Sequence, residues 1–145
     1  RWDVIFLLAG LIPMGIAMEK SGATEWLADQ ILFVGNNFSG FWVLIFFYFV
    51  TTILTEILSN NAAVILMIPI AVKVAESLTL NPLAVMFTVT FAASNSFMTP
   101  IGYQTNTMVY SPGGYRFRDF TRFGAPLSLI QGIIIPFLVI WLYGL

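Results

Sequence analysis

A short polar segment, residues 55–61, lies between two apolar stretches at residues 41–54 and 62–72. Within a bilayer, unwound backbone and bare side-chain amides are tolerated only where protein buries them or where water and ions reach them. The polar segment therefore restricts the chain to folds that enclose it, and it is a candidate binding site. A second polar break at residues 94–106 makes the candidate a pair.

The composition indicates that the chain lies in a membrane. Of 145 residues, 59% are hydrophobic and 9% are charged, and the mean hydropathy is +0.90. A soluble domain has roughly one quarter of its residues charged. We therefore expect an all-α integral membrane protein with several spans, in the plasma (inner) membrane.

The residue types that are absent exclude several kinds of chemistry. The chain has no cysteine and no histidine, which rules out thiol nucleophiles, disulfides, histidine general bases and Cys/His zinc sites. Proteins that bind nucleic acid carry an excess of clustered Lys and Arg, whereas this chain has a net charge of -1, so we do not expect it to bind nucleic acid. Hydroxyls, amides, carboxylates and backbone groups remain, and these suit binding and moving a solute better than breaking bonds. We do not expect an enzyme.

Hydrophobic runs and helix breakers divide the chain into five predicted segments. A surface helix is expected because Trp26, Leu27 and Ile31 fall on one side of a short helix that ends near Asn36 and Asn37. The later break is expected at Pro100 and Gly102, since proline lacks an amide proton and glycine permits unusual dihedral angles. The segments are a span at 1–20, the surface helix at 23–35, a hairpin at 41–78, a broken helix at 83–110 and a span at 125–143. The hairpin legs are expected as helices at 41–58 and 62–78, and the first part of the broken helix is expected to run to about residue 97.

The positions of Lys and Arg predict an orientation. If Arg116, Arg118 and Arg122 are cytoplasmic, Arg1 is also inside and two lysines lie outside, a bias of four to two. The hairpin at 41–78 then enters from the outer face and turns near the midplane. In the competing topology both hairpin legs span the bilayer and residues 59–61 form a surface turn. Because the sequence starts at Arg1, without Met, we also expect it to be part of a larger protein.

The two breaks resemble a known transporter family. Residues 55–63 read Thr-Glu-Ile-Leu-Ser-Asn-Asn-Ala-Ala and residues 97–106 read Phe-Met-Thr-Pro-Ile-Gly-Tyr-Gln-Thr-Asn. These resemble the second half of the divalent anion:sodium symporter family over essentially the whole chain. The resemblance implies one inverted repeat of a secondary transporter, with a re-entrant helical hairpin and a broken transmembrane helix. In the family the hairpin turns at a Ser-Asn-Thr motif, which reads Ser59-Asn60-Asn61 here. The third position differs, and in the family this position helps contact the substrate. The string from Tyr103 onward looks most like the branch with TrkA-C domains.

The resemblance also implies which residues bind ligands. A coupling sodium ion would be held by the Thr55 hydroxyl, the Leu58 carbonyl, the Asn60 side-chain oxygen and the Gly102 carbonyl. The anion would be bound by Ser59, Asn60, Asn61, Tyr103, Gln104 and Thr105. Helix breaks free carbonyls and amides for such sites, and helix N-termini attract negative charge.

The expected function is sodium-coupled secondary transport of a divalent anion, either sulfate or a di- or tricarboxylate. This chain would supply one half of the site, and the N-terminal repeat of the same protein and a second copy in a homodimer would be its partners. Two alternatives stay open. One is a membrane scaffold module that transports nothing, and the other is a proton-coupled or arsenite-type transporter of the same wider superfamily.

Individual residues also have plainer interpretations. Asn60 and Asn61 could turn a hairpin at the surface, because asparagine tolerates the left-handed region. Thr51 and Thr52 are expected to bond back to their own helix carbonyls. Glu56 is an acid deep in an apolar leg and could carry a coupling proton. We favour a structural, hydrogen-bonded role for it.

Overall fold

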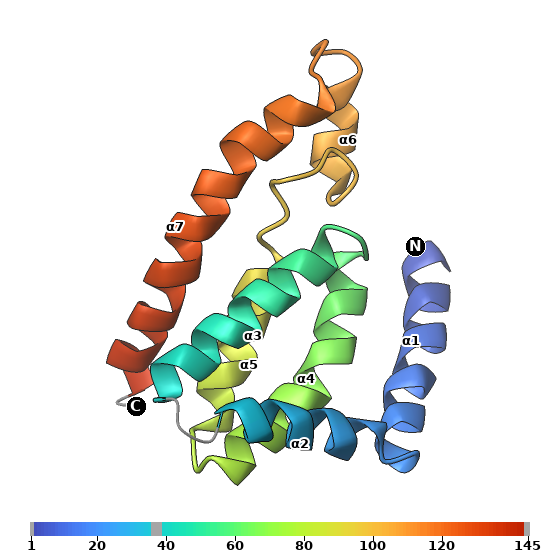
Figure 1. Ribbon diagram of the computed structural model, residues 1–145. Coiled ribbons are helices and arrows are strands. Elements are labelled where there is room, and N and C mark those ends of the chain that lie inside the picture. Colours follow the sequence, from blue (N-terminus) through green and yellow to red (C-terminus); the bar gives the residue numbers. More distant parts are fainter. Residues whose placement is uncertain (1, 36–38, 144–145) are drawn as a thin grey trace.

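The computed structural model describes residues 2–35 and 39–143, and within these ranges the protein is helical with no strand (Figure 1). Arg1, Asn36 and Asn37, used above for the orientation and for the end of the surface helix, lie outside the described residues. The helices are α1 Trp2–Lys20, α2 Ala23–Gly35, α3 Gly40–Thr55, α4 Asn60–Ser77, α5 Pro82–Ala93, α6 Gln104–Tyr110 and α7 Phe117–Tyr143.

Local capping explains where several helices begin. Ser59 precedes α4 in extended geometry and its hydroxyl accepts a hydrogen bond from the Ala62 amide at 3.3 Å. Asn81 caps α5 by accepting from the Leu83 amide, and Pro82 occupies the first turn. The last helix begins at Phe117, earlier than the predicted residue 125, because the Asp119 carboxylate accepts the Arg116 amide at 2.7 Å and completes its first turn.

The two helices beside the polar breaks end earlier than the sequence predicts. The first hairpin leg is predicted to reach Leu58, yet α3 ends at Thr55; the next predicted helix reaches Phe97, yet α5 ends at Ala93. The Thr55 hydroxyl lies 2.7 Å from the Ala93 carbonyl oxygen, and the Ser96 hydroxyl donates to the Thr55 carbonyl at 3.3 Å. The last carbonyl group of each helix thus accepts a side-chain hydroxyl from the other break. These hydrogen bonds replace the backbone hydrogen bonds that a further helical turn would have supplied.

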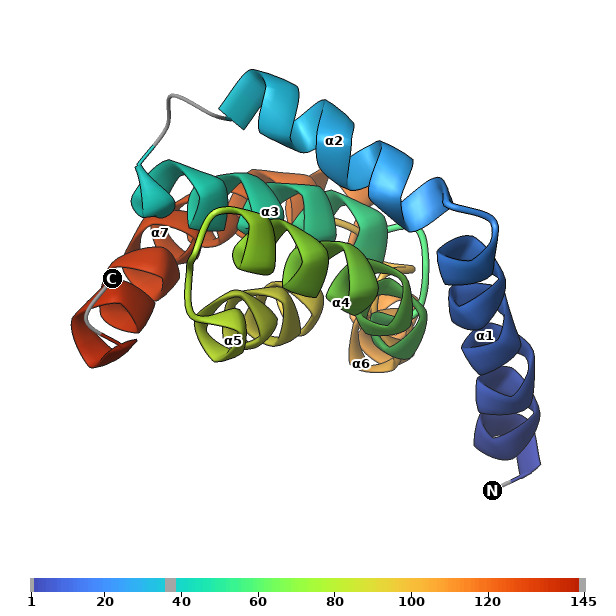
Figure 2. The ribbon, with the colours of Figure 1, turned by 90° about the horizontal axis from the view of Figure 1, so that it is seen from below.

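The core is formed by α3, α4 and α5, with α7 covering one side. Leu44 and Phe47 of α3, Val74 of α4 and Val85 and Val89 of α5 are fully buried in one cluster. The last helix packs against α3 and α5, while α2 packs against α4 and α1. Figure 2 shows α1 and α2 on the outside of the bundle, with α1 and α7 on opposite sides.

Several helices present apolar faces to the outside. Two of the described helices, α4 and α7, are long and apolar enough to cross a membrane, and α3 and α5 are shorter apolar helices. Large side chains such as Phe6, Phe137 and Trp141 are exposed. Exposed apolar surface of this extent is typical of contact with lipid or with further protein.

Candidate functional site

The two polar breaks meet at one cavity of about 430 Å³. The connection between α3 and α4 forms one wall, and the segment before and at the start of α6 forms the other. In the ribbon these two segments face each other (Figure 1). The lining residues are Ile57, Leu58, Ser59, Asn60, Asn61, Ile101, Gly102, Tyr103, Gln104 and Thr107. Every residue expected to bind anion or sodium lines this cavity except Thr55 and Thr105. Thr105 is exposed on α6 and is not part of the wall.

Thr55 lies behind the cavity wall, fully buried, in a cluster of oxygen atoms. Its hydroxyl oxygen is 2.8 Å from Asn60 Oδ1 and 2.7 Å from the Ala93 carbonyl oxygen. A threonine hydroxyl has one hydrogen, and an amide oxygen and a carbonyl oxygen have none. One hydrogen therefore serves two acceptors, and the three oxygens have spare lone pairs.

The connection between the helices is fixed to the unwound segment by Glu56. This carboxylate is 6% exposed. Its Oε1 accepts the Met98 amide at 2.7 Å, and its Oε2 accepts the Thr99 hydroxyl at 2.7 Å. The Thr99 oxygen in turn accepts the Gly102 amide at 3.0 Å. Both carboxylate oxygens thus accept hydrogen bonds from the break, an arrangement that fits the structural, hydrogen-bonded role favoured for Glu56.

Gly102 is approached so closely that a larger residue does not fit. A Cβ atom at this position would lie 2.1 Å from Ser96 Oγ and 2.7 Å from Glu56 Oε2. Contacts this short do not occur between real atoms, so one of the oxygens would have to move. The absence of a side chain lets the Glu56 carboxylate, from the connection after α3, and the hydroxyls of Ser96 and Thr99 converge beside the cavity.

A buried hydrogen-bonded group holds the end of α5, and sequence reasoning did not identify it. The Asn95 amide donates to the Tyr48 hydroxyl, and the Ser128 hydroxyl donates to Asn95 Oδ1 at 3.2 Å. All three residues are buried. They come from the end of α5, from α3 and from α7, so the group connects three elements. A polar residue directly after an apolar helix was the only signal in the sequence.

Two residues of α6 were also missed. Thr107 lines the cavity, and its hydroxyl donates to the Pro100 carbonyl at 2.8 Å. The Asn106 side-chain amide donates to the carbonyls of Ser96 and Thr99 at 2.7 and 3.0 Å. Their place on the helix that follows a break, one turn after Tyr103, is the feature that could have found them.

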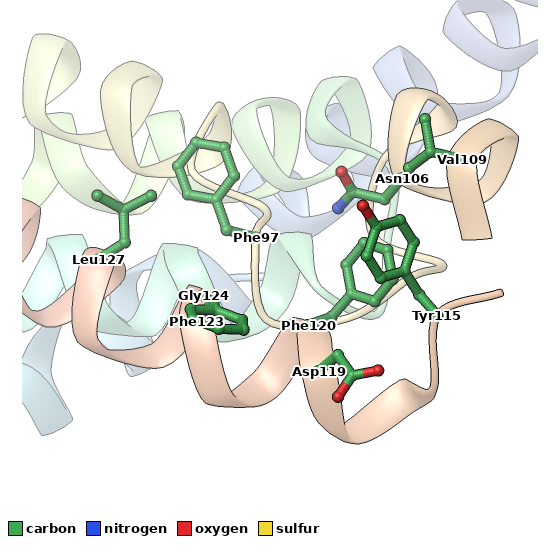
Figure 3. A pocket seen from close by; sticks show the side chains of 9 residues that line it. All are labelled: Phe97, Asn106, Val109, Tyr115, Asp119, Phe120, Phe123, Gly124 and Leu127. Atoms are coloured by element: carbon green, nitrogen blue, oxygen red, sulfur yellow. The ribbon is translucent and has the colours of Figure 1, made fainter. Parts of the chain in front are cut away.

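A larger cavity of about 520 Å³ contains none of the predicted ligand-binding residues (Figure 3). It lies between α6, the start of α7 and Phe97, and most of its wall is aromatic or aliphatic. Its one carboxylate, Asp119, already accepts the Arg116 amide. Its other polar groups are the Tyr115 hydroxyl and the Asn106 amide, and the Asn106 amide is already hydrogen-bonded to two carbonyls, so the smaller cavity, with its several free polar groups, is the candidate site.

Comparison with known proteins identifies the family. The profile described as the sodium:sulfate symporter transmembrane region matches residues 1–145. The chain belongs to this sodium:sulfate symporter family. The resemblance to divalent anion:sodium symporters, read from the two polar breaks, is confirmed. Membership of a transporter family also agrees with the expectation of a transport protein and not an enzyme.

Relatives in this family come from bacteria, algae and mammals. An uncharacterized transporter of Synechocystis is 66% identical over 99% of the chain and 24% of its own length. Sodium/sulfate cotransporter 1 of Chlamydomonas reinhardtii is 34% identical over 97% of the chain and 16% of its own length. Solute carrier family 13 member 2 of Oryctolagus cuniculus is 34% identical over 99% of the chain and 24% of its own length. The sodium:sulfate symporter region described here thus spans about a quarter, or less, of these relatives.

Proposed function

We propose that this chain supplies one half of the site of a sodium-coupled secondary transporter for a divalent anion, either sulfate or a di- or tricarboxylate. The observation that carries the proposal is the single cavity of about 430 Å³ that both polar breaks line. Side chains that merely packed two separate helix ends would not need to leave such a space. The family's sodium/sulfate cotransporters support the choice of ions.

The oxygen atoms near the hairpin connection fit a sodium ion. Hard cations take oxygen ligands, and the cluster of Thr55 Oγ1, Asn60 Oδ1 and the Ala93 carbonyl has one hydrogen for three oxygens. A cation bound among these three oxygens would interact with the lone pairs that the single hydroxyl hydrogen cannot serve. We propose that Thr55 and Asn60 hold sodium through side chains, and that Leu58 and Gly102 add carbonyl oxygens from the cavity wall. The nearby Glu56 carboxylate favours a positive ion further.

The remaining groups of the cavity suit an anion. Ser59, Asn61, Tyr103 and Gln104 offer hydroxyl or amide donors, and the 18-residue helix α4 begins at Asn60 with its positive end at the cavity. No lysine or arginine is among the residues that line the cavity. Placing a dianion there would therefore depend on the countercharge of bound sodium. Each ion would raise the affinity of the other by the same factor, which is the basis of coupled transport.

The packing along α7 supports a hairpin that turns inside the membrane. With 27 residues, α7 is about 40 Å long, whereas the hydrocarbon core is about 30 Å thick. The break is hydrogen-bonded to α7 at Thr121 and Ser128, which lie roughly 6 and 17 Å from its first residue. The hairpin connection is held to this break by the Glu56 carboxylate, which accepts the Met98 amide and the Thr99 hydroxyl. A connection at this depth lies within hydrocarbon if α7 spans. We therefore favour the re-entrant arrangement over two full spans.

The proposed site is incomplete without further protein. We propose that the N-terminal repeat of the same polypeptide contributes the second half-site and that two copies form a dimer in the plasma membrane. The resemblance to the branch with TrkA-C domains adds the proposal of sulfate as the first substrate to test.

Uptake measurements with the full-length protein in proteoliposomes test the function. Radiolabelled sulfate, succinate and citrate are each offered with an inward gradient of sodium, or of potassium as the control cation. We expect uptake of at least one anion with sodium and background uptake with potassium. Equal uptake in the two cations would remove sodium coupling, and uptake driven by a proton gradient would favour the proton-coupled alternative. No uptake of any of the three would contradict transport of these anions.

A further inference from the structure

Some of the carbonyl groups in the unwound segment between α5 and α6 accept hydrogen bonds from side chains, and others do not. Outside a helix, each carbonyl needs a donor from elsewhere. The Met98 carbonyl accepts the Thr121 hydroxyl at 3.1 Å, and the Pro100 carbonyl accepts the Thr107 hydroxyl at 2.8 Å. The carbonyls of Ser96 and Thr99 both accept from one side chain, Asn106. Four carbonyls of this segment are thus used.

The Gly102 carbonyl differs from these four. Within residues 2–35 and 39–143, no hydrogen-bond donor is directed at its oxygen. Gly102 is buried from the surface and lines the cavity of about 430 Å³. Its carbonyl, like that of the adjacent Ile101 in the cavity wall, therefore remains available for a ligand after the carbonyls of Ser96, Met98, Thr99 and Pro100 have been satisfied.

Asn106 supplies a donor that the sequence of the break cannot supply. In a continuous α-helix the Ser96 carbonyl would accept the amide of the residue four positions later, which is Pro100. Proline has no amide hydrogen. The Asn106 side chain extends from α6 toward the segment that carries Phe97 (Figure 3), and its amide donates at 2.7 Å to this orphaned carbonyl. A second hydrogen of the same amide is directed at Thr99, so one side chain sets the path of the chain into Gly102.

Asn106 is not part of the anion and sodium cavity. It lines the larger, apolar cavity, whereas its neighbour Thr107 lines the smaller one. Any effect of Asn106 on the ions must therefore act through the backbone that it holds.

We propose that Asn106 is a positioning residue that, by occupying the Ser96 and Thr99 carbonyls, leaves the Gly102 carbonyl as the backbone ligand presented to the coupling cation. This inference rests on the proposed function. Without the Asn106 amide, two part-buried carbonyls lose their donor, and the segment shifts to satisfy them. The Gly102 carbonyl then leaves its place at the cavity, and cation binding weakens more than anion binding.

The test compares sodium dependence with anion dependence in the full-length transporter. Sulfate uptake is measured in proteoliposomes for the wild type, Asn106→Ala and Asn106→Ser. We expect Asn106→Ala to raise the half-saturating sodium concentration about tenfold, a change of about 1.4 kcal/mol. The KM for the anion at saturating sodium should stay within about twofold. Serine keeps one donor, so Asn106→Ser should have an intermediate sodium dependence, and it serves as the test if the alanine variant folds poorly.

Thr121→Val is the matched control. It removes the donor of another carbonyl in the same segment, Met98, through an exposed hydrogen bond on the α7 side. We expect its sodium dependence to equal that of the wild type. The inference is overturned if Asn106→Ala and Asn106→Ser leave the half-saturating sodium concentration unchanged, if only the maximal rate falls, or if Thr121→Val raises it equally. A wild type without sodium-dependent uptake is a different result, because it removes the proposed function itself.

Discussion

Thr55 Oγ1 lies 2.8 Å from Asn60 Oδ1, across the connection between α3 and α4. The hydroxyl also lies 2.7 Å from the Ala93 carbonyl at the end of α5. A single buried oxygen thus joins the hairpin connection to the second break. This arrangement explains how two polar segments separated by about forty residues can form one site.

Removing the Thr55 hydroxyl tests its place in the proposed sodium site. Thr55→Val keeps the shape of the side chain but leaves Asn60 Oδ1 and the Ala93 carbonyl without a donor, at a cost of about 1–3 kcal/mol. We expect the half-saturating sodium concentration for uptake to rise at least about tenfold. Sodium titration of uptake, together with a melting curve in detergent, separates binding from folding.

Thr55→Ser is the control for this variant. Serine retains the hydroxyl and loses one methyl group, which lowers stability by about 0.8 kcal/mol. We expect its sodium dependence to stay close to that of the wild type. If serine and valine raise the half-saturating concentration equally, the hydroxyl is not a sodium ligand.

A methyl group at Gly102 should be tolerated poorly. The added Cβ would lie 2.1 Å from Ser96 Oγ and 2.7 Å from Glu56 Oε2, and overpacking of this kind typically costs about 1–3 kcal/mol. We expect Gly102→Ala to lower the melting temperature and to reduce uptake. Gly10→Ala is the matched control, since a Cβ there meets nothing within 4 Å. Ser96→Ala removes the nearest atom, so the double variant should recover part of the lost stability; no recovery would contradict the contact.

Much of the fold followed from residue types with strong local preferences. Helix α5 begins at Pro82, next to the predicted start at residue 83, because Asn81 caps it and capping is a local interaction between residues two or three positions apart. The break near Pro100 and Gly102 was predictable because both residues disfavour a continuous helix. The two breaks could be assigned to one site because their sequences resemble those of a family in which they meet.

Other features could not be predicted because they depend on contacts between distant parts of the chain. The hydrogen bond of Glu56 to the Met98 amide and that of Asn95 to Tyr48 join residues more than forty positions apart. The early ends of α3 and α5 result from such contacts and not from local propensity. Asn106 was overlooked for the same reason, since its role appears only once the path of the unwound segment is known.

The role of Glu56 can be tested by changing its charge without changing its shape. In Glu56→Gln the amide group must face either the Met98 amide or the Thr99 hydroxyl, so one of the two hydrogen bonds is lost or reversed. We expect a loss of about 1–3 kcal/mol of stability, measured by unfolding in detergent. Thr99→Val removes the partner of Oε2, and a double-mutant cycle should give a coupling energy of about 0.5–3 kcal/mol.

The same variants distinguish a structural role of Glu56 from proton coupling. A structural acceptor predicts that uptake by Glu56→Gln remains driven by sodium, at a lower maximal rate. If the wild type is driven by a proton gradient and Glu56→Gln alone loses this response, the carboxyl group carries the coupling proton and the structural interpretation is wrong.

The depth of the hairpin connection can be measured by cysteine labelling, because residues 1–145 contain no cysteine. Asn61 is exposed at the start of α4 and lines the cavity, whereas Lys73 is exposed near the other end of the same helix. In a full-length background without other cysteines, Asn61→Cys should react with a membrane-impermeant thiol reagent and should be protected by sodium together with the anion. Lys73→Cys should react at one rate under all conditions, since it lies roughly 18 Å along the helix from Asn61. Unprotected, rapid labelling of Asn61→Cys would place residues 59–61 in a surface turn and would favour two full spans, because only a connection enclosed at the site can be shielded by bound ions.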